Sequence, residues 1–239
     1  MISISSKTLT MRSSQLLLYK YDSDKITNLY MNRYDMIFDH LVDKKIILLE
    51  LGVLNGGSLL LWHDYFPLGS IVGIDINLSK EFKSADRIHT YEGSQVDTKF
   101  LSRVANEIAP DGFDIIIDDA SHLGELTKIA FWHLFDNHLK PDGIYVIEDW
   151  GTGYWDDWPD GKSLNFDSYI SSDVSPNPEE SPGPMPCHSY GMVGFIKQLV
   201  DEQGARDASR QQLQGTTKRD SKFESLTITP SIVIVKKAR

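Results

Sequence analysis

Cysteine is nearly absent from this chain, whose 239 residues include only Cys187. A single cysteine excludes an internal disulfide framework and is typical of proteins in the reducing cytoplasm, where we expect this one. No stretch approaches the roughly 18 uninterrupted apolar residues of a membrane span, so no membrane partner is expected. The first residues also lack the apolar core of a signal peptide.

Basic charge is scarce as well, because 24 lysines and arginines stand against 34 acids, a formal net charge of −10. Between Glu148 and Pro186 the chain has nine acids and one base, so most of the net charge lies in this segment. A phosphate backbone would be repelled there, and no basic stripe elsewhere compensates. We therefore expect no nucleic-acid partner, and a small molecule as the substrate.

What the chain does have is a buried strand that ends in a glycine-rich turn, in residues 46–58. Four apolar residues lead to Glu50, Gly52 and Gly56 follow, and a helix is predicted from about Ser58. Glycines let the backbone approach a ligand closely, and a helix start offers free N–H groups. The spacing is not the G-x-G-x-x-G of dinucleotide-binding folds. The turn predicts a site for a nucleotide-like molecule, and a plain strand-to-helix turn is the alternative.

Buried strands recur about every 20–30 residues and alternate with helical patterns. Strands are expected at residues 46–49, 71–75, 88–92, 113–119 and 144–147, with a closing pair at 223–229 and 231–235. Helices are expected at residues 21–41, from 57 or 58 onward, and at 97–109, 124–139 and 191–201. This alternation predicts an α/β fold, a single Rossmann-like, doubly wound and mainly parallel sheet with a closing antiparallel hairpin. Such sheets bind ligands beyond the carboxyl ends of their strands.

The expected domain spans residues 21–239. Residues 1–20 show weak patterning, and we expect a loose arm or a contact within a homo-oligomer. Regular patterning also disappears over residues 151–190, which hold six of the ten prolines. A loop this long is disordered or functional, and its position after a strand that ends in acids favours a lid over the substrate.

Two strand ends carry candidate cofactor contacts. Asp75 closes the second strand, where an acid in a parallel nucleotide-binding sheet accepts hydrogen bonds from ribose hydroxyls. Ser94 and Gln95 follow the third strand and are expected beside an adenine edge. For the third strand, a simple turn with Asp97 capping the next helix is the alternative.

Three acids are expected on one rim of the sheet, because Asp119 closes the fourth strand while Glu148 and Asp149 close its neighbour. Hard oxygen ligands in this number suit Mg²⁺, with Ca²⁺ and Mn²⁺ as lesser options. His122 stands three residues after Asp119, within reach of anything that the metal holds. The alternative is that these are solvated loop carboxylates, with Asp118 or Asp119 capping the next helix.

Taken together, these residues resemble the macrocin O-methyltransferase family of metal-dependent sugar O-methyltransferases. The resemblance is carried by Glu50-Leu-Gly-Val-x-x-Gly-Gly-Ser58, Gly73-Ile-Asp75, Gly93-Ser-Gln95-x-Asp97, Ile117-Asp-Asp119-x-Ser-His122, Glu148-Asp149, Ser23-Asp24-Lys25 with Tyr30 and Tyr34, and Tyr154-Trp155. It departs from the family before Tyr30, where a histidine is replaced by Asn28-Leu29, at Ser94, where an acid is usual, and in the 159–189 loop.

The resemblance implies S-adenosylmethionine as cofactor, with its methionine end near Gly52 and Lys25. It also implies Mg²⁺ on Asp119, Glu148 and Asp149, His122 as general base, and Asp119 rather than Asp118 as the member of the pair that points to the metal and the catalytic site. The expected cofactor contacts are Lys25, Glu50, Gly52, Gly56, Ser58, Asp75, Ser94, Gln95 and Asp118.

The predicted function is Mg²⁺-dependent methyl transfer from S-adenosylmethionine to a hydroxyl of a small molecule, in particular a sugar of a glycosylated natural product. A vicinal diol is expected, with one hydroxyl on the metal and the other beside the sulfonium. The nearest alternative is a cofactor-binding protein that assists another biosynthetic enzyme. An NAD-dependent oxidoreductase is disfavoured by the glycine spacing, and a lectin-like or scaffolding module leaves the rim of functional groups without a role.

Overall fold

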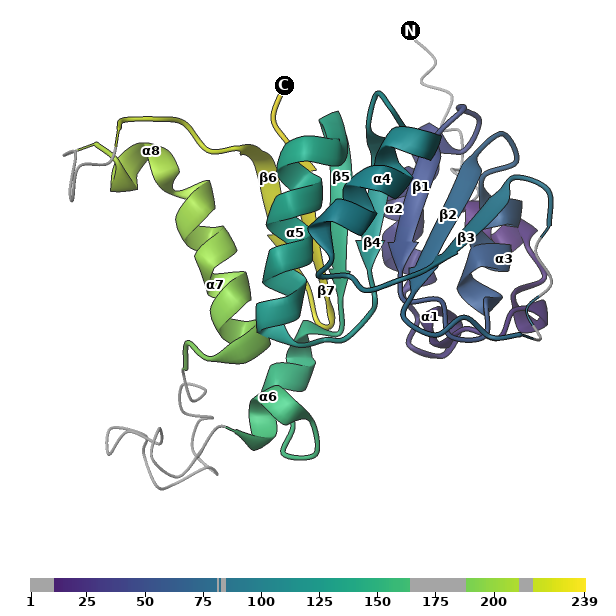
Figure 1. Cartoon of the computed structure of the whole chain (residues 1–239), viewed down its shortest axis with the longest axis horizontal. Helices are drawn as coiled ribbons and strands as arrows, with labels where there is room; N and C mark the ends of the chain where they lie inside the picture. The colour runs from purple at the N-terminus through teal and green to yellow at the C-terminus, as the bar shows by residue number, and fades with distance from the viewer. Residues whose placement is uncertain (1–10, 81, 83–84, 164–187, 211–216) are drawn as a thin grey trace, which may run out of the picture. The chain divides into compact units, whose positions relative to one another are not determined.

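The computed structural model describes residues 11–80, 82, 85–163, 188–210 and 217–239. By its contacts the chain divides into two compact units, Met1–Ser94 and Gln95–Arg239 (Figure 1). None of the described helices combines the length and the hydrophobicity that crossing a lipid bilayer requires. The middle of the predicted lid, residues 164–187, lies outside the described residues.

The first unit contains three parallel strands in the order β3-β2-β1, with Glu50 of β1 opposite Gly73 of β2 and Asp75 of β2 opposite Glu92 of β3. Its elements are the 3-10 helices η1 (Arg12–Gln15), η2 (Leu18–Lys20) and η3 (Asp39–Leu41), the α-helices α1 (Asp24–Thr27), α2 (Met31–Phe38) and α3 (Gly57–Tyr65), and the strands β1 (Ile47–Leu51), β2 (Ser70–Asp75) and β3 (Ile88–Glu92). The three expected strands and the helix after the glycine turn are therefore present.

The helix expected over residues 21–41 is broken into α1, α2 and η3. Leu29 adopts a left-handed backbone with φ of 58°, and the Tyr30 N–H donates to the Lys25 carbonyl five residues back, which closes α1. Side-chain periodicity alone did not reveal this break, because Ile26, Tyr30 and Tyr34 follow a helical spacing although the backbone between them is not continuously helical. Tyr34 and Phe38 pack on Trp62 of α3 in a buried aromatic cluster, with the Tyr34 and Trp62 centroids 4.9 Å apart.

The chain before residue 21 is fixed to the first unit from residue 12 onward. The buried carboxylate of Asp35 accepts hydrogen bonds from the Ser13 N–H at 3.0 Å and from the Tyr65 hydroxyl at 2.8 Å. The Arg12 guanidinium donates to the Tyr65 carbonyl at 3.0 Å. These contacts differ from the loose arm that we expected for residues 1–20, of which 1–10 lie outside the described part of the chain.

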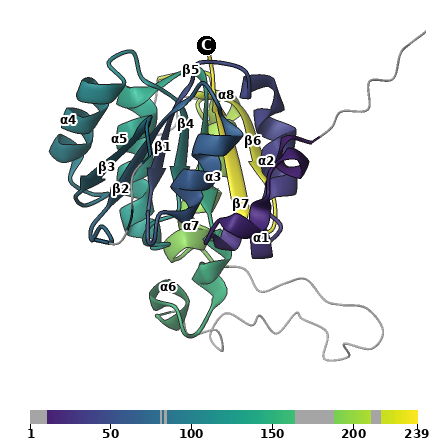
Figure 2. The same cartoon turned by 90° about the vertical axis from the view of Figure 1, so that its right-hand side faces the viewer.

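The second unit contains four strands in the order β4-β5-β7-β6. Strands β4 and β5 are parallel, and β7 runs antiparallel to both β5 and β6 (Figure 2). Its elements are α4 (Thr98–Ile108), β4 (Phe113–Asp118), α5 (Gly124–His138), β5 (Leu139–Glu148), η4 (Trp150–Tyr154), α6 (Pro159–Lys162), α7 (Gly191–Gln203), α8 (Ala205–Ala208), β6 (Phe223–Ile228) and β7 (Ile232–Lys237). The expected closing pair is thus an antiparallel hairpin.

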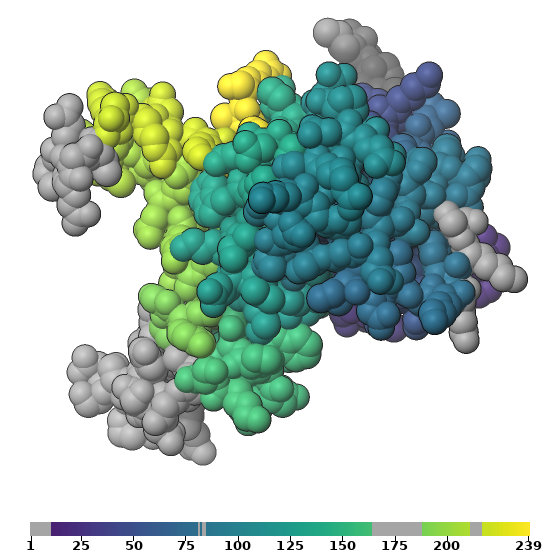
Figure 3. Space-filling model, in the orientation of Figure 1, coloured from purple at the N-terminus to yellow at the C-terminus, as the bar shows by residue number. Residues whose placement is uncertain are grey.

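The core of the second unit is centred on Phe131 of α5. Its ring packs edge-on against Tyr145 of β5 at 4.7 Å and against Phe195 of α7 at 5.5 Å, and all three side chains are buried. Helix α7 therefore packs on α5, beside which it lies on the surface in Figure 3. Burial of side chains of this size stabilises such a layer by about 1.5–3 kcal/mol each.

A hydroxyl between two imidazoles joins α4 to α5. The Ser102 Oγ lies 2.9 Å from His133 Nε2 and 2.9 Å from His138 Nε2. Burial lowers the pKa of both histidines, and His133 and Lys237 lower that of His138 further. Below about pH 6.5 the histidines of the unfolded chain bind protons that the folded chain excludes. The contribution of His133 and His138 to the free energy of unfolding is therefore complete above that pH and is lost as the pH falls below it.

We therefore expect the wild type to lose more stability between about pH 7.5 and about pH 5.5 than the variant His133→Gln/His138→Gln, which has no imidazole to titrate there. Urea unfolding at the two pH values measures the difference. An equal loss in both proteins would show that other groups set the acid limit of stability.

Candidate functional site

In the first unit, the carboxylate of Asp75 holds the glycine turn. Its Oδ2 accepts hydrogen bonds from the N–H groups of Val53 at 2.7 Å and Leu54 at 3.0 Å, and its Oδ1 accepts one from Asn77 at 2.9 Å. The turn requires glycine at Gly52, where φ is 91°, and at Gly56, where φ is 81° just before α3 begins. The predicted ribose contact and the predicted glycine turn are thus one hydrogen-bonded structure.

Three more predicted cofactor residues, Lys25, Glu50 and Ser58, contact one another in the interior of the first unit. Lys25 Nζ lies 3.2 Å from Glu50 Oε1, and both side chains are at most 1% exposed. Glu50 also accepts hydrogen bonds from the Ser58 hydroxyl at 2.7 Å and from the Trp62 indole N–H at 3.3 Å. Burial of this pair restrains the end of β1 and the first turn of α3, between which the glycine turn lies.

In the second unit, Asp119, His122 and Asp149 come together after β4 and β5. One ligand atom from each side chain lies within 4.8 Å of the others, and all three residues are partly buried. His122 Nε2 is 3.7 Å from Asp119 Oδ1. His122 and Asp149 both have left-handed backbones, with φ of 51° and 53°, a strained conformation for residues other than glycine that often marks functional sites.

The donor set of this cluster fits a divalent cation. Ligand atoms around one Mg²⁺ are about 3–4 Å apart, and these three atoms lie within 4.8 Å of one another. Two carboxylate oxygens suit Mg²⁺, and the imidazole is either a third ligand or a base beside the ion. Glu148, the other predicted ligand, is fully buried at the end of β5 and is not one of the three clustered residues.

Asp118, one residue before Asp119, is buried and forms hydrogen bonds with two other polar side chains. Its Oδ1 accepts a hydrogen bond from Gln95 Nε2 at 3.4 Å, and its Oδ2 accepts one from the Tyr145 hydroxyl at 3.4 Å. Burial raises the pKa of Asp118 to about 7, and the charge of Asp119 acts in the same direction. The structure thus brings together two predicted cofactor residues of this unit, Gln95 and Asp118.

Thr152, which no sequence pattern singled out, connects the segments that carry the clustered residues. The hydroxyl of Thr152, which is buried in η4, donates to the Asp149 carbonyl at 2.9 Å and also lies 3.3 Å from the His122 carbonyl. It therefore links the two loops that carry the clustered side chains. A threonine after a strand has many ordinary roles, so the sequence contained no signal for this one.

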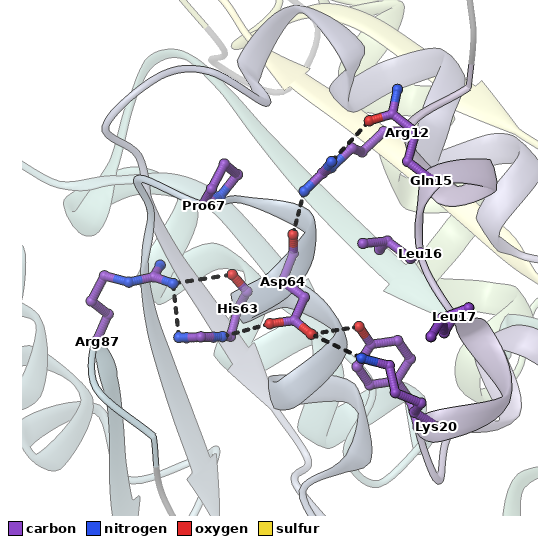
Figure 4. A pocket seen from close by; sticks show the side chains of 10 residues that line it. Arg12, Gln15, Leu16, Leu17, Lys20, His63, Asp64, Pro67 and Arg87 are labelled. Atoms are coloured by element: carbon purple, nitrogen blue, oxygen red, sulfur yellow. Dashed lines mark hydrogen bonds and ion pairs between the residues drawn. The ribbon is translucent and has the colours of Figure 1, made fainter.

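A cavity of about 440 Å³ lies at the other end of α3 from the glycine turn and is lined by none of the predicted site residues (Figure 4). Arg12 donates to the carbonyl of Tyr65, and Arg87 donates to that of Phe66 at 3.1 Å, so both guanidinium groups satisfy carbonyls at the end of α3. Tyr21 donates to Asp64 at 2.7 Å. The contacts of Arg12 and Arg87 cap a helix end, and they account for both guanidinium groups of the cavity without a ligand.

No family model matches the sequence. Individual relatives do match. The chain is 34% identical over 196 residues to the mycinamicin VI 2''-O-methyltransferase of Micromonospora griseorubida, covering 72% of this chain and 48% of the relative. It is 33% identical over 196 residues to the demethylmacrocin O-methyltransferase of Streptomyces fradiae, covering 72% and 49%. The chain thus spans about half the length of these curated relatives.

The structure is similar to that of the methyltransferase MycE in complex with Mg, S-adenosylhomocysteine and mycinamycin VI. The TM-score is 0.69 at 28% sequence identity, and the match covers 96% of this chain and 55% of MycE. The likeness confirms the predicted fold class, a Rossmann-like methyltransferase fold with mostly parallel strands and a closing antiparallel hairpin. The chain is thus similar in sequence to the mycinamicin VI 2''-O-methyltransferase and the demethylmacrocin O-methyltransferase, and similar in fold to MycE.

Proposed function

We propose that the chain catalyses Mg²⁺-dependent transfer of a methyl group from S-adenosylmethionine to a sugar hydroxyl of a glycosylated natural product. The observation that supports this most directly is the cluster of Asp119, His122 and Asp149 in a chain whose relatives are sugar O-methyltransferases. MycE is described with Mg and S-adenosylhomocysteine, the two ligands that the proposal requires.

Methyl transfer to oxygen requires that a hydroxyl lose its proton as the oxygen attacks the methyl carbon. The new carbon–oxygen bond forms as the carbon–sulfur bond breaks, and the bonding electrons stay on sulfur. In the proposed site Asp119 and Asp149 would hold the ion, with Glu148 buried directly before Asp149, and the ion would lower the pKa of a hydroxyl bound to it. His122 takes the proton of the acceptor hydroxyl, and Asp119 orients the His122 imidazole at 3.7 Å.

For the methyl donor we propose the predicted contacts within each unit. In the first unit, the turn at Gly52 and the Lys25–Glu50 pair are assigned to the methionine end, and Asp75, which accepts the Val53 N–H of the same turn, is assigned to the ribose. In the second unit, Gln95 and Asp118, which are hydrogen-bonded to each other, are proposed for the adenine side. The order of the turn, held by Asp75, supports this assignment because a preorganised loop binds without an ordering cost.

Calorimetric titration tests the proposal, with S-adenosylhomocysteine and MgCl₂ as separate probes. We expect both probes to bind the wild type, and we expect Asp119→Asn/Asp149→Asn to lose the Mg²⁺ heat and keep the nucleoside heat. The matched control is Asp156→Asn/Asp157→Asn, which removes two exposed acids of the following loop and is expected to keep both heats. A wild type that binds the nucleoside and no Mg²⁺ would contradict the metal assignment.

Turnover with a panel of glycosides that carry vicinal diols tests the reaction itself. We expect one methylated product and one equivalent of S-adenosylhomocysteine per turnover, both detected by mass spectrometry. Binding of both probes without methylation of any diol would instead favour the accessory protein that assists another biosynthetic enzyme. Absence of nucleoside binding would overturn both functions.

A further inference from the structure

One carboxylate, that of Asp160, accepts hydrogen bonds from the first turns of two helices of the second unit. Asp160 Oδ2 accepts a hydrogen bond from the Gly124 N–H at 2.8 Å and another from the Met192 N–H at 2.7 Å. Gly124 starts α5, and Met192 is the second residue of α7. The short helix α6, to which Asp160 belongs, accordingly lies at the first turns of α5 and α7 in Figure 1. A carboxylate at a helix start satisfies free N–H groups and the helix dipole.

The junction around Asp160 is packed so closely that the carboxylate has little freedom. Gly191 has φ of 54°, and a β-carbon there would lie 2.4 Å from Asp160 Oδ2. A β-carbon on Gly124 would lie 2.1 Å from the carbonyl carbon of Gly191. Only glycine fits at these two positions, and the close approach fixes Asp160 against the backbone of both helices.

The same turn touches His122 from the other side. Trp158 stands directly before α6, and its ring centroid lies 5.8 Å from that of His122, with the planes tilted by 52°. Trp158 contacts the His122 ring directly. Asp160 binds the N–H of Gly124, which is only two residues after His122, so it also restrains the backbone that follows His122. His122 also has a left-handed backbone with φ of 51°, which needs such support to persist.

We propose that Trp158 and Asp160 are positioning residues for His122, and that α6 is the clamp through which they act. The inference rests on the proposed function, because it assigns a task to the base of that reaction. Trp158 limits rotation of the imidazole, and Asp160 fixes the chain that follows it. Proton transfer needs hydrogen-bond distance to the acceptor hydroxyl, and a misplacement of about 1 Å costs up to about 100-fold in rate.

The test compares Trp158→Ala and Asp160→Ala with the conservative variants Trp158→Phe and Asp160→Asn in the full chain. We expect the alanine variants to lower kcat about 10–100-fold, with the KM for S-adenosylmethionine and the Mg²⁺ affinity within about 2-fold. Phenylalanine keeps a ring on His122 and asparagine keeps one acceptor oxygen, so both are expected to recover most of the rate. Asp157→Ala, which removes an exposed acid of the same loop, is the matched control.

A second readout separates the clamp from the reaction. The imidazole ¹H–¹⁵N resonances of His122, assigned by their absence in His122→Asn, are expected to shift or broaden in Trp158→Ala and Asp160→Ala and to stay in place in Asp157→Ala. Unchanged His122 resonances, or an unchanged kcat in the alanine variants, would overturn the clamp. If the wild type turned over no glycoside, the proposed function would fail, while the resonances would still decide the clamp.

Discussion

His122→Ala is expected to lower the kcat of methyl transfer by about 10²–10⁴-fold, the usual contribution of a positioned general base. The imidazole of His122 lies 3.7 Å from Asp119 and in the cluster with Asp149, so it would be within reach of a hydroxyl that an ion there held. Without it the proton must pass to water, which has no fixed position. Initial rates of S-adenosylhomocysteine release at saturating donor measure the loss.

The control for this prediction is His89→Ala, which removes an exposed histidine on β3 and is expected to change the rate by less than about 2-fold. Calorimetry with S-adenosylhomocysteine should give the same affinity for wild type and His122→Ala, because the proposed base would contact the acceptor and not the donor. Full activity of His122→Ala would show that another group, or the ion alone, accepts the proton.

The strands were predictable from sequence because a strand buried on both faces is a continuous apolar run. Residues 115–117 and 144–147 show this pattern, and both lie in the buried parts of β4 and β5. The break at Leu29 was not predictable, since an exposed leucine in a left-handed conformation leaves no periodic trace. Its conformation depends on contacts of α1 and α2 with the rest of the first unit.

The clustered residues Asp119, His122 and Asp149 were predictable because the ends of neighbouring parallel strands meet at one edge. The direction in which each of these three side chains points was not predictable from the sequence. That direction is set by left-handed backbones at two of the three positions and by Thr152, which bridges their carbonyls. The role of Asp160 was even less predictable, because the two backbone N–H groups that it binds belong to residues 36 and 32 positions away in the sequence.

Lys25→Met is expected to destabilise the protein by about 3–5 kcal/mol, the usual result of removing one partner of a buried ion pair. The Lys25 ammonium is 3.2 Å from Glu50, and the side chains are 1% and 0% exposed. Methionine has nearly the volume of lysine, so it fills the space while taking away the positive charge. The Glu50 carboxylate then keeps its hydrogen bonds from Ser58 and Trp62 and stays buried without its cation.

Urea unfolding without cofactor measures this loss, and two further variants assign it to charge. Lys222→Met removes the cation of the Lys222–Asp136 pair, whose side chains are 43% and 38% exposed, and should cost about 0–1 kcal/mol because water solvates the remaining acid. Lys25→Met/Glu50→Gln removes both buried charges and should recover part of the stability that Lys25→Met loses, since a neutral amide is less costly to bury than a lone carboxylate. If Lys25→Met cost no more than Lys222→Met, the Lys25–Glu50 pair would have no structural role, and its burial beside the glycine turn would have to serve the ligand alone.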